Sequence, residues 1–114
     1  MYTIIGTVTA RPETRDELAG LLAAQVAPTR AEAGCICYDF HVDAADPCVF
    51  VFYENWTDRA ALDRHLAMPH LKPLLSQLDR LLACPIEIRP LTMLSQWQGP
   101  GAGALPSRRG SGES

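Results

Sequence analysis

One stretch of the sequence holds most of the side chains that could act on a small molecule: Glu54, Trp56, His65 and His70. Imidazole titrates close to neutral pH, so His65 is the best candidate for a general base. Trp56 offers a flat indole on which a planar ring could stack. Glu54, two residues before it, could orient a histidine. These residue types together fit proton transfer to or from a planar ligand.

Further side chains nearby could complete such a site. Tyr38 or Asn55 could hydrogen-bond an oxygen of the ligand. Asn55, however, has the opposite strand parity from Trp56, so both line one sheet face only if the strand twists or bulges. The remaining candidates for ligand contact lie on the same stretch of chain and are Phe52, Leu62 and His70.

Each of these residues also has a purely structural interpretation. A histidine on a leucine-rich helix face, such as His65, often only packs, whereas a catalytic histidine in a pocket is expected to be partly solvated. His70 could cap a helix start, and Trp56 and Tyr38 could belong to the core. Glu54 could bond backbone N–H groups at the turn that follows its strand.

The sequence does not predict a metal site. His65 and His70 are five residues apart with Pro69 between them, so they do not share a helix face as the histidines of HExxH do. Cys35 and Cys37 are expected on one strand face, but C-x-C alone is not a zinc signature. Both are expected to be small buried side chains with free thiols.

The element that positions these side chains is a predicted strand over Cys48–Trp56. It is rich in β-branched and aromatic residues and apolar on both faces, so both faces need a cover. From Thr57, the expected N-cap, the spacing of apolar residues becomes helical and places His65 on the face turned toward the sheet. Pro69 ends this helix and begins the next one.

The other predicted elements complete a single domain. Pro12 opens an early helix, and Pro28 kinks or ends it. Three further strands are predicted over Tyr2–Ala10, Cys35–Val42 and Ile86–Trp97. Pro90 weakens the last of them and suits an edge position. The order β-α-β-β-α-α-β predicts an α+β fold, the ferredoxin-like split βαβ with an antiparallel sheet. Its helices cover one sheet face only, so we expect a homodimer built through the other face.

Composition bounds the class of protein. The 114 residues suffice for one domain, expected over residues 1–98, and the Gly/Ser/Pro-rich segment Gly99–Ser114 is expected to be a disordered tail. The net charge of −3, without a basic cluster, argues against nucleic-acid binding. No apolar run is long enough for a membrane span and no secretory signal is visible. Four cysteines without export favour a cytoplasmic protein.

A set of short motifs carries a family resemblance: Glu32-Ala33-Gly34-Cys35 with Tyr38, then Glu54-Asn55-Trp56, then His65 and Pro69-His70. In order and spacing they resemble the antibiotic biosynthesis monooxygenase family, most closely its quinol-monooxygenase-like branch, from about Tyr2 to Leu94. The resemblance implies a dimeric α+β barrel that oxidises a quinol or phenolic substrate with O2 and needs neither metal nor flavin. Haem-degrading relatives carry an Asn on the first strand, which this chain lacks.

Such chemistry makes specific demands on the protein. Triplet O2 reacts slowly with closed-shell molecules, but a phenolate can donate an electron to it directly. The protein must supply a dry apolar pocket, a base, which would be His65, and a donor for the developing oxyanion. Two alternatives remain open: an isomerase of a small carbonyl compound, as in another relative, and a non-catalytic dimeric domain that binds an aromatic ligand.

Overall fold

The computed structural model describes residues 1–97, so the predicted tail Gly99–Ser114 lies outside the described residues. The strands are β1 (Tyr2–Thr9), β2 (Cys35–Val42), β3 (Val49–Trp56) and β4 (Glu87–Leu91). The α-helices are α1 (Arg15–Ala23), α2 (Val26–Arg30), α3 (Arg59–Leu66), α4 (Lys72–Leu75) and α5 (Leu78–Leu81). Single 3-10 turns precede α1 (Pro12–Thr14) and α4 (Pro69–Leu71).

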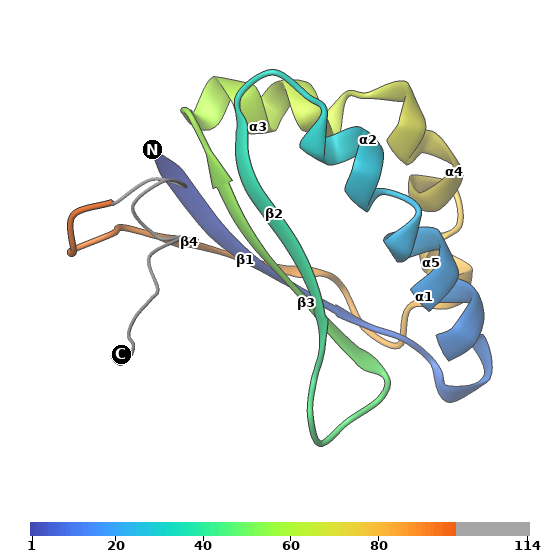
Figure 1. Cartoon of the computed structure of the whole chain (residues 1–114). Helices are drawn as coiled ribbons and strands as arrows, with labels where there is room; N and C mark the ends of the chain where they lie inside the picture. Colours follow the sequence, from blue (N-terminus) through green and yellow to red (C-terminus); the bar gives the residue numbers. More distant parts are fainter. Residues whose placement is uncertain (98–114) are drawn as a thin grey trace.

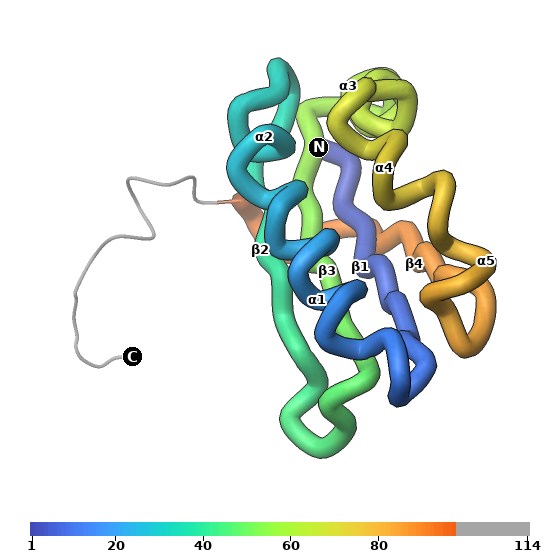
Figure 2. Tube along the Cα trace, turned by 90° about the vertical axis from the view of Figure 1, so that its right-hand side faces the viewer, coloured from blue at the N-terminus to red at the C-terminus, as the bar shows by residue number. Residues whose placement is uncertain are grey.

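The four strands form one antiparallel sheet in the order β2-β3-β1-β4. The helices all lie on one side of this sheet (Figure 1), where α1 and α2 form one column and α3 to α5 a second (Figure 2). This is the ferredoxin-like arrangement, so the predicted fold class is confirmed. No helix within residues 1–97 is both long enough and apolar enough to cross a membrane.

The two faces of β3 differ as its alternating sequence predicts. Phe50, Phe52 and Trp56 point toward the helices and are at most 4% exposed. Val51 and Tyr53 lie on the opposite face and are only partly buried. No helix of the described residues lies over that second face, the open face of the sheet.

Proline and capping residues set the helix boundaries. Pro69 begins a new turn after α3, as predicted, while Pro28 lies within α2 and the break falls before it, at residues 24–25. The predicted N-cap Thr57 is wrong by one residue, because the Asp58 carboxylate accepts the Ala61 N–H at 2.8 Å.

Two strand predictions also need correction. A β-bulge between Cys35 and Cys37 pairs Cys35 with Trp56 and Cys37 with Asn55, so the two thiols lie on opposite faces rather than one. The last strand ends at Leu91, well before the predicted Trp97. It is an edge strand, as Pro90 indicated.

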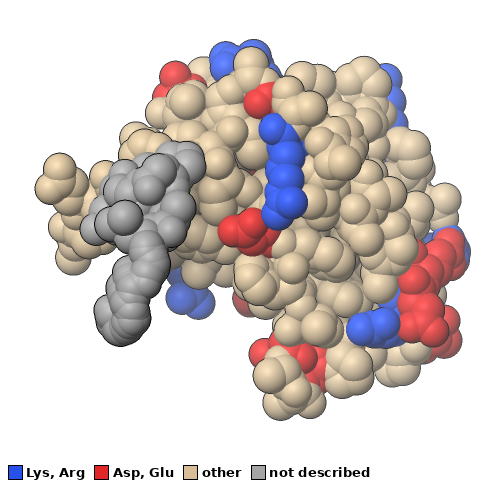
Figure 3. Space-filling view, viewed as in Figure 1, with Lys and Arg blue, Asp and Glu red and all other residues tan. Residues whose placement is uncertain are grey.

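Charged side chains join the two helical columns at the surface. Arg80 on α5 donates to both carboxylate oxygens of Glu17 on α1, and acidic and basic atoms meet over these helices (Figure 3). Both side chains are about half exposed, so this ion pair contributes little to stability. Packing of the apolar helix faces on the sheet holds the layers together.

The turn before β2 depends on a glycine. Gly34 has a φ of 88°, and a Cβ built there would lie 2.6 Å from the Ala61 Cβ. We therefore expect Gly34→Ala to lower the free energy of unfolding by roughly 2–4 kcal/mol. Gly20→Ala is the matched control: it lies in α1 with nothing near its Cβ and should raise stability by about 0.5–1 kcal/mol. Urea denaturation measures both; equal stability of the two variants would contradict the proposed strain.

Candidate active site

A small cavity lies between the sheet and the helices. Its volume is about 120 Å³, and its walls are mostly aliphatic and aromatic side chains. The exceptions are Tyr38, Glu54 and His65, which supply polar atoms. Three of the lining residues are about half exposed and mark the mouth of the cavity: Leu66, Leu75 and Ile88.

His65 packs between two aromatic rings. Its ring centroid is 5.7 Å from that of Tyr38, which lines the cavity, and 4.8 Å from that of Trp56. Trp56 is 0% exposed and is not among the lining residues, so the prediction that a ligand stacks on it is wrong. His65 is only 4% exposed, so the expectation of partial solvation is wrong. Phe52 and Leu62, both predicted to contact the ligand, also line the cavity.

A carboxylate lies behind His65, on the side away from the cavity. Nδ1 of His65 donates to Oε2 of Glu32 at 2.8 Å, and the Glu32 side chain is only 5% exposed. Because Nδ1 carries the hydrogen, Nε2 keeps its lone pair and is free to accept a proton. A carboxylate that fixes the tautomer of a general base in this way is the arrangement of hydrolase triads.

Glu32 Oε2 also contacts a second histidine. Nε2 of His70 lies 2.7 Å from it, and Nδ1 of His70 lies 2.6 Å from Oε1 of Gln25. The break at Pro69 allows this, because it turns the chain so that His70 approaches the same carboxylate as His65 does.

Sequence reasoning missed the roles of Glu32 and Gln25. Glu32 belongs to the motif that carries the family resemblance, yet it lies in the turn between α2 and β2, where no periodic pattern reports where a side chain points. Gln25 lies in the break between α1 and α2. The one available signal was Gly34, whose left-handed turn brings this loop close to α3.

The cluster of Glu32, His65 and His70 raises the question of a metal ion. Ligand atoms held 2.0–2.2 Å from a tetrahedral ion stand about 3.3–3.6 Å apart. The two contacts to Glu32 Oε2 are 2.8 and 2.7 Å, which are hydrogen-bond lengths. The cluster as it stands is therefore a hydrogen-bonded chain, which would have to open to hold a cation.

Glu54 has a different partner from the predicted histidine. Nε1 of Trp56 donates to its Oε1 at 2.9 Å, which leaves the second oxygen at the cavity wall. Burial raises the pKa of the Glu54 carboxyl to about 7, partly opposed by the Trp56 hydrogen bond. Burial likewise raises the pKa of Tyr38, which keeps its hydroxyl neutral.

Asn55 does not reach the cavity. Its neighbours in the strand, Glu54 and Trp56, face the helices, so Asn55 points to the open face, where Oγ1 of Thr3 donates to its Oδ1 at 2.5 Å. Asn55 is thus separated from the site for the parity reason that the sequence already indicated. Five of the predicted site residues line the cavity: Tyr38, Phe52, Glu54, Leu62 and His65. Trp56 and His70 lie outside its wall, Trp56 packed against His65 and His70 on Glu32.

The raised pKa of Glu54 makes stability depend on pH. The folded value of about 7 exceeds the ordinary 4.5, so protonated Glu54 favours the fold below pH 4.5, and this contribution is lost as pH rises through 7. Glu54→Gln removes the titration, so its stability relative to the parent should rise by roughly 1–3 kcal/mol between pH 5 and pH 8. Chemical denaturation at both pH values checks this, with exposed Glu13→Gln as the control. A constant difference between Glu54→Gln and the parent at the two pH values would contradict the account.

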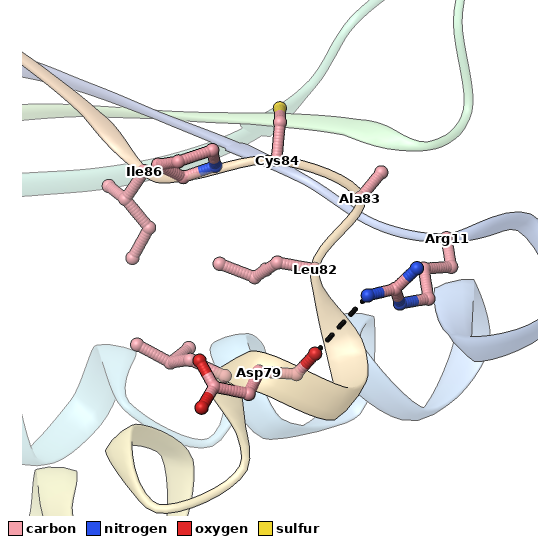
Figure 4. A pocket seen from close by; sticks show the side chains of 8 residues that line it. Arg11, Asp79, Leu82, Ala83, Cys84 and Ile86 are labelled. Atoms are coloured by element: carbon pink, nitrogen blue, oxygen red, sulfur yellow. Dashed lines mark hydrogen bonds between the residues drawn. The ribbon is translucent and has the colours of Figure 1, made fainter.

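A second hollow lacks such an arrangement. It encloses about 430 Å³ beside α5, and its walls include Arg11 and Cys84. Arg11 donates to the Asp79 backbone carbonyl at 3.3 Å, and the Cys84 thiol points away from Asp79 and Leu82 (Figure 4). Among the described residues, no buried acid–base pair lies at this second hollow. The cavity beside His65 is therefore the candidate active site.

Comparison with known proteins bears on the family of the chain. The pattern of the family described as antibiotic biosynthesis monooxygenase matches residues 1–74. The crystal structure of PA3566 from Pseudomonas aeruginosa is 40% identical, covers 82% of this chain and 94% of that chain, and has a TM-score of 0.78. The structure of Rv0793 from Mycobacterium tuberculosis is 34% identical over 85% of this chain and 98% of that chain, with a TM-score of 0.79.

The names of the relatives indicate a type of activity but no substrate. The curated sequence of Rv0793, 37% identical over 82% of this chain and 91% of its own length, is named provisionally as a monooxygenase. An uncharacterised Synechocystis protein, sll1783, is 35% identical over 75% of this chain, which spans only 58% of that protein. On the family match and these identities, the chain belongs to the antibiotic biosynthesis monooxygenase family.

Proposed function

We propose that this protein is a monooxygenase that oxidises a single-ring phenol or hydroquinone with O2, with His65 as the general base. The family and the name of Rv0793 support a monooxygenase-type activity. The observation that carries the proposal is the position of His65: it lines an apolar cavity while Glu32 holds its Nδ1 at 2.8 Å. Its Nε2 is thereby available to a ligand hydroxyl.

The size and polarity of the cavity favour one class of substrate. An apolar cavity of about 150 Å³ accepts benzene, so about 120 Å³ suits one aromatic ring, with substituents extending through the mouth. No arginine or lysine is among the lining residues within the described part of the chain. A phosphate or carboxylate would therefore lack a counter-ion and meet Glu54 instead, which argues against an isomerase of a phosphorylated compound.

The proposed reaction needs no external reductant. His65 Nε2 takes the hydroxyl proton, and the resulting phenolate gives one electron to O2. The phenoxyl radical and superoxide combine at a ring carbon that bears hydrogen, and His65 returns its proton to the peroxide. Loss of that C–H proton and cleavage of the O–O bond then give a quinone and water. Phenol plus O2 equals quinone plus water, so all four electrons come from the substrate.

Two side chains would assist this sequence. Glu54 is partly protonated near pH 7 and could donate a hydrogen bond to the peroxide through its free oxygen. Trp56, fixed by Glu54, packs on His65 and would hold its imidazole in place. Neither role requires a bound cofactor.

Oxygen uptake with a graded set of substrates tests the proposal. Neutral single-ring phenols and hydroquinones should support uptake, whereas the same rings bearing a phosphate, and three-ring analogues, should not. Uptake should survive exhaustive chelation. Activity that appears only with added metal would overturn the proposed reaction, and binding of the rings without uptake would favour the non-catalytic binding domain.

A further inference from the structure

The hydrogen-bonded chain behind His65 has a feature that the proposed reaction does not use. A single oxygen, Oε2 of Glu32, contacts a nitrogen of both His65 and His70. An ionised carboxylate can only accept hydrogen bonds. Each of these two nitrogens must therefore carry a hydrogen.

The other nitrogens of the two rings differ in their surroundings. Nδ1 of His70 lies 2.6 Å from the carbonyl oxygen of the Gln25 side chain, which is also an acceptor, so this nitrogen carries a hydrogen as well. His65 needs a hydrogen only on Nδ1, because its Nε2 has no hydrogen-bond partner among the described residues. This count of donors gives His70 two hydrogens and a positive charge.

Burial points to the same ring. The His70 side chain is 23% exposed, whereas that of His65 is only 5% exposed. Desolvation penalises the charged form, so a charge shared between the two rings costs less on His70. The hydrogen-bond geometry and the burial both favour the positive charge on His70.

We propose that His70 is a resident imidazolium that neutralises Glu32, so that Glu32 can orient His65 without protonating it. A buried carboxylate with His65 as its only partner would favour an imidazolium there, whose Nε2 could not accept a proton. The positive charge on His70 removes that pull and leaves the orienting hydrogen bond. His70 and Gln25 are thus positioning residues, and their role in catalysis rests on the proposed function.

The neighbouring ionisable groups fit this division of charge. Glu54, whose burial raises its pKa to about 7, adds part of a second negative charge on the cavity side. Cys35 stays neutral because burial, with the nearby Glu32, raises its thiol pKa to about 11, and Tyr38 stays neutral because burial raises its pKa. In this proposal His70 is the cation in contact with Glu32, at 2.7 Å.

Nitrogen NMR of the resting protein tests the assignment without any substrate. The chain has three histidines, so the full-length protein labelled with ¹⁵N-histidine gives few signals to assign. At pH 7.5 we expect both nitrogens of His70 to be protonated and His65 to be protonated on Nδ1 only. Exposed His41 serves as the internal reference. A doubly protonated His65, or a neutral His70 whose Nδ1 accepts from the Gln25 amide instead, would overturn the proposal.

Two variants separate charge from mere structure. His70→Gln keeps a donor for Glu32 but carries no charge, whereas His70→Lys restores the charge. In His70→Gln we expect the acidic limb of the pH–rate profile to move about one pH unit or more toward alkaline pH, with alkaline turnover kept. His70→Lys should return the limb to its parent position, and the control His41→Gln should not move it.

The two proposals can fail separately. Equal loss of turnover at every pH in His70→Gln, without rescue by His70→Lys, would show a purely structural His70 and overturn the charge assignment. Absence of O2 uptake in the parent would overturn the proposed function instead. The NMR result on the resting protein decides the charge assignment in that event.

Discussion

Replacement of His65 by glutamine is expected to lower turnover by roughly a hundredfold to ten-thousandfold, the range typical of a lost general base. Glutamine can still donate a hydrogen bond to Glu32, so the buried carboxylate keeps both of its partners. The fold should therefore survive, and turnover and melting temperature can be measured on one preparation. His41→Gln, on the exposed end of the sheet, is the matched control.

His65→Ala separates catalysis from packing in the same experiment. It removes the imidazole of a residue that is only 4% exposed, and so leaves a cavity. It also leaves His70 as the one remaining histidine partner of Glu32. We expect it to lose roughly 2–4 kcal/mol of stability beyond His65→Gln, with the same loss of turnover per folded molecule. Folded His65→Gln with unchanged turnover would remove His65 from the mechanism.

The second large effect concerns assembly. We propose that a second copy of the chain covers the open face, where Ile5, Val51 and Tyr53 are only partly buried. Tyr53 lies near the centre of this face, where it pairs with Ile5 and Asp39, so Tyr53→Lys is expected to turn a homodimer into a monomer.

Val42→Lys is the control for this substitution. Val42 is 48% exposed near the end of β2, and its strand parity places it on the helix side of the sheet. It should leave the dimer intact. Sedimentation at micromolar concentration measures both variants, and a parent protein that sediments as a monomer would contradict the proposed dimer.

Sequence periodicity predicted the parts of the site that lie on regular elements. The alternation of β3 placed Phe52, Glu54 and Trp56 on one face, and the 3.6-residue spacing of α3 turned His65 toward them. The same parity rule indicated that Asn55 would face away. These positions follow from local geometry, so a single sequence carries the information.

The remainder depended on contacts between segments far apart in the chain. Glu32 and Gln25 lie outside the regular helices and strands, and His70 follows a proline break. At these positions no periodic pattern of apolar residues indicates where the side chain points. The bulge that separates Cys35 from Cys37 likewise cannot be recognised from the alternation of apolar and polar residues. Glu54 bonds the indole N–H of Trp56, two residues away on the same face, and not the histidine that the sequence suggests.

Turnover with ¹⁸O2 tests the central claim most directly. With a neutral single-ring phenol and no added cofactor, the parent protein should place one labelled atom in the quinone and the other in water, with one O2 consumed per substrate. His65→Gln should show neither uptake nor label. Oxidation that yields hydrogen peroxide and an unlabelled product, or labelled product formed equally by His65→Gln, would contradict the account.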